Sequence, residues 1–134
     1  MRVLFDSNVL LSAGLFPNGK AAETVNYAAA KHKIVISNTI VDEVRRVVSA
    51  KFAEKMPLFE RFFASFTYEY AYISQEIVAS SAIEISDPKD KHVLVSATFA
   101  NVDILITGDK HFFERKYEEI KVMTPSEFFG KVLK

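Results

Sequence analysis

Four acidic side chains stand where strands are expected to end or helices to begin. Asp6 and Asp109 each follow a short apolar run, and Glu43 and Asp90 fall in the first turns of two predicted helices. Each acid alone has an ordinary structural explanation, because a carboxylate caps a turn or favours the positive amino end of a helix dipole. Considered together, the four acids indicate a shared site.

Clustered carboxylates favour a divalent cation. Like charges at short range repel strongly, so such a cluster is costly unless a cation neutralises it. Oxygen ligands suit Mg²⁺ or Mn²⁺, which bind a few carboxylates together with water and phosphate. Zinc is a poorer fit, since the chain has no cysteine and its three histidines, His32, His92 and His111, are scattered in the sequence.

Strand-like and helix-like segments alternate along the chain. Short apolar runs predict strands at residues 3–5, 34–36, 70–73, 103–107 and 120–123. Helical spacing and capping residues predict helices over residues 21–31, from 37 to about 54, 58–66, 75–81, after Asp87-Pro88, and from residue 124 onward. This alternation favours an α/β fold with a mainly parallel sheet covered on both faces. In such sheets ligands bind beyond the carboxyl ends of the strands, where Asp6 and Asp109 are predicted to lie.

Sequence patterns predict structural roles for several residues near the acids. Thr39 and Asp42 have capping-box spacing, which leaves Glu43 without that role. Pro57 is expected to break the helix that precedes it. Asp87 is expected to cap the next helix, with metal ligation only as an alternative. Asp103 begins a predicted strand at the opposite end from Asp109 and is interpreted as structural.

Composition limits the class of protein. The 134 residues fit one domain, and 17 basic residues balance 17 acidic ones, so a broad positive field for nucleic acid is excluded. The absence of cysteine excludes disulfides and thiolate catalysis. No apolar stretch approaches the roughly 20 residues that span a bilayer, and the amino terminus is unlike a signal peptide. We therefore expect a protein without membrane association, located in the cytoplasm.

Four short motifs resemble the PIN-domain nucleases and occur in that family's order. They are residues 6–12 (DSNVLLS), 41–44 (VDEV), 87–90 (DPKD) with Ala97 following, and 105–109 (LITGD). The resemblance implies a single PIN-like domain over residues 1–134, folded as a three-layer, flavodoxin-like α/β/α sandwich. It also implies an endoribonuclease that depends on Mg²⁺ or Mn²⁺.

The same resemblance suggests roles for individual residues. It implies that Asp6, Glu43, Asp90 and Asp109 are the catalytic and metal-binding acids. Asn8 and Thr107 match the family's supporting polar positions.

Basic residues near the motifs are candidate substrate contacts. Lys110 and Lys89 are predicted to contact RNA phosphates. Members of the family often carry an acid where this chain has His111. This histidine could position phosphate or mark a shorter metal site, but we interpret it as a solvated surface residue.

The resemblance also bears on partners. PIN proteins commonly pair up, and single-domain members are often the toxin of a toxin–antitoxin pair, so a homodimer and an antitoxin protein are expected. The 12 phenylalanines and five tyrosines are many for a small core, which also favours an interface.

Other α/β proteins with acids at strand ends fit less well. Phosphatases of the haloacid-dehalogenase type need a second aspartate two residues after the first, where this chain has Asn8. Receiver domains need adjacent early acids and a lysine at the end of the last strand, whereas Asp6 has no acidic neighbour. A catalytically silent PIN-like module that binds RNA or protein remains the alternative to an enzyme.

Overall fold

The protein is an α/β sandwich built on a parallel sheet. A computed structural model describes residues 1–117 and 119–132. Its strands are β1 (Arg2–Phe5), β2 (Lys33–Ser37), β3 (Glu69–Ala71), β4 (Ile104–Ile106) and β5 (Lys121–Met123). Within these ranges they form one sheet in the order β3-β2-β1-β4-β5, with every neighbouring pair parallel.

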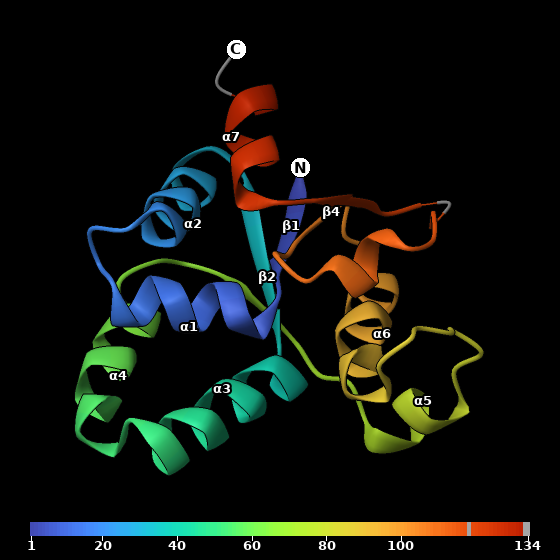
Figure 1. The fold of residues 1–134 in the computed structure, drawn as a ribbon, viewed down its shortest axis with the longest axis horizontal. Helices are drawn as coiled ribbons and strands as arrows, with labels where there is room; N and C mark the ends of the chain where they lie inside the picture. Colours follow the sequence, from blue (N-terminus) through green and yellow to red (C-terminus); the bar gives the residue numbers. More distant parts are fainter. Residues whose placement is uncertain (118, 133–134) are drawn as a thin grey trace.

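Helices cover both faces of this sheet. They are α1 (Ser7–Leu15), α2 (Lys20–Lys31), α3 (Asn38–Lys51), α4 (Met56–Ala64), α5 (Gln75–Ser80), α6 (Lys91–Phe99) and α7 (Pro125–Val132). Short 3₁₀ turns occupy η1 (Ala53–Lys55), η2 (Pro88–Asp90) and η3 (Lys110–Phe113). In Figure 1 the sheet lies between α1 and α2 on one side and α6 on the other. The predicted three-layer α/β/α architecture is therefore confirmed.

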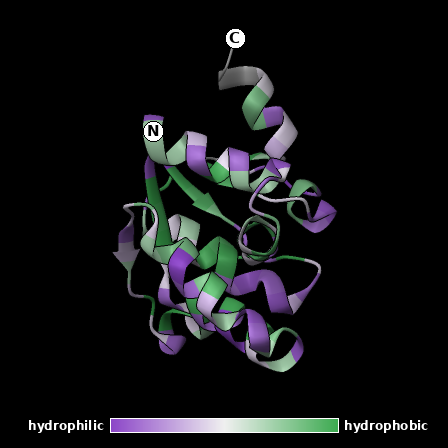
Figure 2. Cartoon of the chain, turned by 90° about the vertical axis from the view of Figure 1, so that its left-hand side faces the viewer, coloured by the Kyte–Doolittle hydropathy of each residue, from purple (hydrophilic) through white to green (hydrophobic). Residues whose placement is uncertain are grey.

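The central strands are apolar because both of their faces are buried. Leu4 of β1 pairs with Val35 of β2 on one side and with Leu105 of β4 on the other, and none of the three is exposed to solvent. Figure 2 shows these strands as a hydrophobic interior beneath helices of mixed character. The apolar runs end at the same edge, where the Asp6 amide donates to the Ile106 carbonyl at 2.9 Å. Residues that directly follow β1 and β4 are thereby brought side by side.

Helix α1 was not predicted from the sequence. Its buried residues include Val9, Leu10 and Ala13, and further apolar residues occupy its other sides, so it lacks the one-sided stripe that reveals a surface helix. It also packs closely on α4. A Cβ at Gly14 would lie 2.5 Å from Phe59 Cε1, so only glycine fits here without a shift of the phenylalanine ring.

One local prediction was wrong. Ser37, not Thr39, caps α3, and its hydroxyl accepts from the Ile40 amide at 3.3 Å, so the predicted Thr39–Asp42 capping box does not form. The predicted interruption of the helix before Pro57 is confirmed. α3 ends at Lys51, and Pro57 lies in the first turn of the separate helix α4, where its missing N–H costs nothing.

Other local predictions are confirmed. Asp87 caps η2 by accepting from the Lys89 amide at 3.0 Å. Asp103 accepts from the Arg2 amide at 2.8 Å, which ties β4 to β1 at the amino end of the sheet.

Among the described residues, no helix has the length and apolar character needed to cross a bilayer. The predicted domain, 1–134, also includes residues 118 and 133–134, which lie outside the described residues.

Candidate active site

Asp6 and Asp109 are held at the sheet edge by one shared hydroxyl group. Asp6 directly follows β1 and is only 3% exposed. The buried Thr107 hydroxyl donates to Asp6 Oδ2 at 2.8 Å and accepts from the Asp109 amide at 3.0 Å. Asp109 in turn caps η3 by accepting from the His111 amide at 2.9 Å. The backbone around the two carboxylates is therefore fixed by short-range bonds.

Asp90 completes a crowded group of acids. It ends η2 and immediately precedes α6. Burial raises the pKa of Asp90 to about 7, with further contributions from Asp109, Asp6 and Asp87. Burial is also the main reason that the pKa of Asp6 is raised; its hydrogen bond to Thr107 opposes this shift, and the charge of Glu43 adds to it. Asp6 thus interacts electrostatically with each of the other three predicted acids, which places all four in one group.

Glu43 differs from Asp6 and Asp90 because its pKa is lowered rather than raised. Its Oε1 accepts a hydrogen bond from the Ser7 hydroxyl and lies 3.1 Å from His92 Nε2. The hydrogen bond from His92 is the largest cause of its lowered pKa. Glu43 therefore stays ionised near neutral pH, whereas Asp90 is partly protonated there.

A polar network orients His92. Its Nδ1 lies 2.9 Å from the Thr39 hydroxyl, which is 3.2 Å from Ser96 Oγ. Ser96 donates to the buried Ser37 hydroxyl at 2.8 Å. With Nε2 donating to Glu43, Nδ1 of a neutral ring accepts from Thr39. The network links α3 to α6 and fixes the ring that meets Glu43.

His111 belongs to the cluster, so its interpretation as a solvated residue was wrong. Its Nδ1 lies 3.1 Å from Asp109 Oδ1 and 3.8 Å from Asp90 Oδ2. Both this Nδ1 and Asp90 Oδ2 are buried and lack a hydrogen-bond partner among the described residues. Ligand atoms of Asp87, Asp90 and His111 all lie within 4.8 Å of one another. His92 and His111 are separated in the sequence, yet each lies beside an acid of this group.

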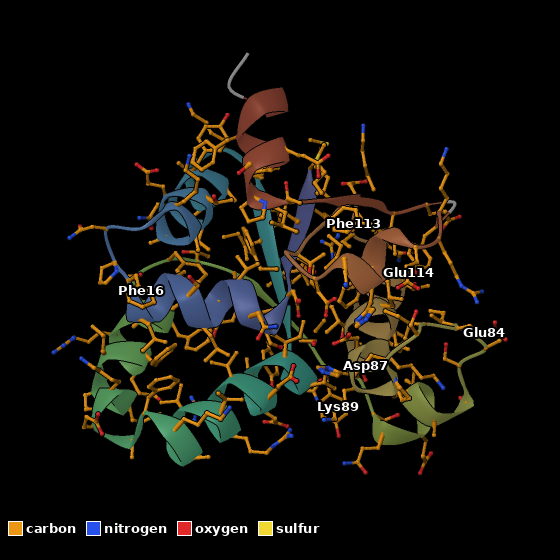
Figure 3. All side chains as sticks on the ribbon, viewed as in Figure 1. Phe16, Glu84, Asp87, Lys89, Phe113 and Glu114 are labelled. Carbon is orange, nitrogen blue, oxygen red and sulfur yellow. The ribbon has the colours of Figure 1, made fainter. Side chains whose placement is uncertain are left out.

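The remaining predicted residues lie around the rim. Asn8 is exposed on the first turn of α1, and its side chain makes no hydrogen bond within the described part of the chain. Lys110 is exposed at the start of η3. Lys89 is also exposed, and Figure 3 shows it with Asp87 between α3 and α6.

Sequence reasoning missed two residues that contact Glu43, namely Ser7 and His92. Ser7 directly follows Asp6, which was a usable signal. His92 follows Asp90 by two residues, but only the packing of α6 on α3 reveals its partner.

The raised pKa of Asp90 predicts that the metal-free protein becomes less stable as pH rises. Because the folded pKa, about 7, exceeds the ordinary 3.8, the folded state retains a proton that the unfolded chain releases. We expect the free energy of unfolding in EDTA to fall by on the order of 2 kcal/mol between about pH 5 and pH 8. Asp90→Asn is expected to remove most of this loss in urea titrations, whereas the exposed Glu84→Gln retains it. An equal pH slope in both variants would contradict the assignment.

Comparison with known proteins agrees with the fold. A family model described as "PIN domain" matches residues 2–111. The structure is similar to one of VapBC2 from Rickettsia felis bound to a promoter DNA fragment, with TM-score 0.69, 17% identity and coverage of 92% of this chain and 98% of that chain. It is also similar to the T. brucei RRP44 PIN domain, with TM-score 0.57, 12% identity and coverage of 98% and 80%. No curated protein matches the chain in sequence. The family match spans most of the chain and includes all four acids, so the chain belongs to the PIN domain family.

Proposed function

We propose that this protein is an endoribonuclease that hydrolyses RNA phosphodiester bonds with Mg²⁺ or Mn²⁺. One observation carries the proposal: Asp6, Glu43, Asp90 and Asp109 converge from four elements, and no lysine or arginine among the described residues forms an ion pair with any of them. PIN domains are nucleases as a family, which agrees with this chemistry.

The donor set fits a divalent cation. Asp90 Oδ2 and His111 Nδ1 are buried without hydrogen-bond partners in the described part of the chain, and burial together with the neighbouring acids raises the pKa of Asp90. Unpartnered buried polar atoms and a raised carboxyl pKa are both unfavourable without a cation, and both are common at sites that bind one. When bound, a divalent cation would neutralise the acids, polarise a phosphate and make a nearby water more acidic.

The side chains divide the remaining work. Asp6, Asp90 and Asp109 would hold the cation, with Thr107 fixing two of them and Asn8 as a supporting polar residue at the rim. Glu43, kept ionised by His92, is placed to orient the attacking water and accept its proton. Asp87 and His111 offer further ligand atoms beside Asp90.

Lys110 and Lys89 are proposed to contact the RNA backbone beside this group. Both are exposed at the rim, so neither must leave a buried position to reach a phosphate.

The proposed biological setting is a toxin–antitoxin pair in the cytoplasm. The VapBC2 complex is a structural neighbour, which supports an antitoxin protein as partner. Phe16, Phe99 and Phe113 are 63%, 52% and 40% exposed, which supports surfaces that a partner or a second copy would cover. We propose that the protein forms a homodimer.

Incubation of the purified protein with a mixed RNA pool tests the activity. We expect cleavage with Mn²⁺ or Mg²⁺, none with EDTA, and none of single-stranded DNA of matched sequence. Activity in EDTA would contradict the metal requirement. Metal binding without any cleavage would favour the silent binding module instead.

His92 is expected to act by positioning Glu43. His92→Ala removes the Nε2 contact at 3.1 Å, so we expect the cleavage rate to fall about tenfold. His92→Gln, whose amide can donate to Glu43, is expected to recover part of the loss. The control is His32→Ala, because His32 lies by the amino terminus, 3.3 Å from the Met1 amine. Equal rates for His92→Ala and wild type would exclude the role.

A further inference from the structure

A large cleft opens beside the acidic cluster. Its volume is about 1040 Å³, and Glu43 and His92 form part of its wall. One side is the amino-terminal half of α3, and the other is the segment from residue 70 to α5. Lys89 lies at its edge, and Figure 3 shows this residue beside the junction of α3 and α6. A chain that passes the acids can therefore continue directly into this cleft.

Two tyrosine rings stand exposed in the cleft. Tyr70 and Tyr72 are 56% and 69% exposed, although both line the cleft wall. Tyr70 lies in the edge strand β3, and Tyr72 follows the strand's last residue, Ala71, so neighbouring backbone presents both rings to the same cleft. The other exposed large hydrophobic residues among those described, which are Met1, Phe16, Phe99 and Phe113, do not line this cleft.

The backbone that carries these rings is fixed. The Asn38 side chain accepts from the Ile73 amide at 2.6 Å and donates to the Ile73 carbonyl at 3.1 Å. Tyr70 and Ala71 pair with Ile36 and Ser37 of β2. The rings are therefore presented from an ordered edge next to the site, which favours a ligand with a flat apolar face.

The charges in the cleft limit what that ligand can be. Arg46 and Lys89 line it, and neither side chain forms a hydrogen bond or ion pair within residues 1–117 and 119–132. Asp42 and Glu76 line it too, so the cleft is no continuous positive channel. Stacking of the ligand on the tyrosine rings must then contribute more to binding than electrostatic attraction to a phosphate backbone. Unpaired nucleobases stack on aromatic side chains, whereas bases inside a duplex are covered on both faces.

We infer that this cleft binds unpaired RNA nucleotides next to the scissile phosphate, with bases stacked on Tyr70 and Tyr72 and phosphates at Arg46 and Lys89. This inference rests on the proposed nuclease function and adds the side chains that contact the nucleotides beside the scissile phosphate, with Tyr70 and Tyr72 as the rings on which unpaired bases stack.

Binding measured apart from cleavage tests the inference. Fluorescence anisotropy of a short labelled RNA, alone or annealed to its complement, would be followed with Mg²⁺ in the full-length Asp90→Asn protein, and gels would confirm that the probe stays intact. We expect Tyr70→Ala and Tyr72→Ala each to weaken single-strand binding about five- to tenfold, while phenylalanine at either position retains it. Phe16→Ala is the matched control, because Phe16 is exposed at the carboxyl end of α1, the end opposite Asp6 (Figure 3).

Salt dependence gives a second readout. With about two phosphate contacts on a single strand, the logarithm of the binding constant is expected to fall with a slope of about −1.4 against the logarithm of salt concentration. A much steeper slope would show a broad electrostatic track and overturn the inference.

The outcomes separate this inference from the proposed function. Single-strand binding that depends on the tyrosines supports the cleft assignment, even if the wild-type protein cleaves no RNA. Cleavage of RNA with binding unaffected by the alanine variants overturns the cleft assignment and leaves the nuclease in place. Duplex binding as tight as single-strand binding overturns it as well. Absence of RNA binding also overturns it.

Discussion

Asp90→Asn is expected to lower the rate of RNA cleavage by at least about a hundredfold, which corresponds to several kcal/mol of transition-state stabilisation. Burial and the charges of Asp109, Asp6 and Asp87 raise the pKa of Asp90, and its Oδ2 is buried with no hydrogen-bond partner among the described residues. Asparagine keeps the size of the side chain but removes the negative charge that would hold a cation.

Two features make this experiment selective. Asp90→Asn is expected to fold at least as stably as the wild type without metal, because it removes a crowded charge. A loss of cleavage activity in this variant would then reflect the loss of the Asp90 carboxylate and not a loss of folded protein. Glu84→Gln makes the same chemical change at an acid whose side chain is 74% exposed, and should cleave at the wild-type rate. If Asp90→Asn retained full activity in gel-based cleavage assays, the cluster would not be the active site.

His111→Asp is expected to shift the metal preference from Mn²⁺ toward Mg²⁺. Imidazole nitrogen favours Mn²⁺ and later transition metals relative to Mg²⁺, which prefers oxygen. Because His111 Nδ1 has no hydrogen bond and lies close to Asp109 and Asp90, it is available as a ligand. We expect the ratio of Mg²⁺ to Mn²⁺ dissociation constants to fall on the order of 10- to 100-fold in the variant.

Calorimetry and spectroscopy together check this second prediction. The ratio matters, because an added carboxylate raises the affinity for both cations. Mn²⁺ bound to the wild type should also show coupling to a nitrogen nucleus by pulsed electron paramagnetic resonance, and the coupling should disappear in His111→Asp. Lys110→Ala changes the neighbouring side chain and should preserve both readouts. An unchanged ratio with no nitrogen coupling would show that His111 is not a ligand.

The sequence predicted the edge of the sheet well because the signal there is local. Asp6 and Asp109 each follow a buried run, and the carboxyl ends of parallel strands must meet at one edge. Helix α1 escaped prediction for the opposite reason, since a helix that is apolar on most sides has no period to detect.

Residues that depend on packing could not be predicted. Thr39 has the spacing of a capping residue, yet its hydroxyl meets His92 and Ser96 on α6, far away in sequence. His111 looks like a surface residue until η3 folds back toward Asp90. In both cases the competing partner belongs to another element, and local patterns contain no information about it.

The most direct test of the central claim, that these carboxylates form a divalent-cation site, is the anomalous scattering of Mn²⁺ in crystals of the protein. We predict a peak among the carboxylate oxygens of Asp6, Asp90 and Asp109, within bonding distance of at least two of them, and no such peak in Asp90→Asn crystals. A peak elsewhere, or no peak in wild-type crystals at saturating Mn²⁺, would contradict the account.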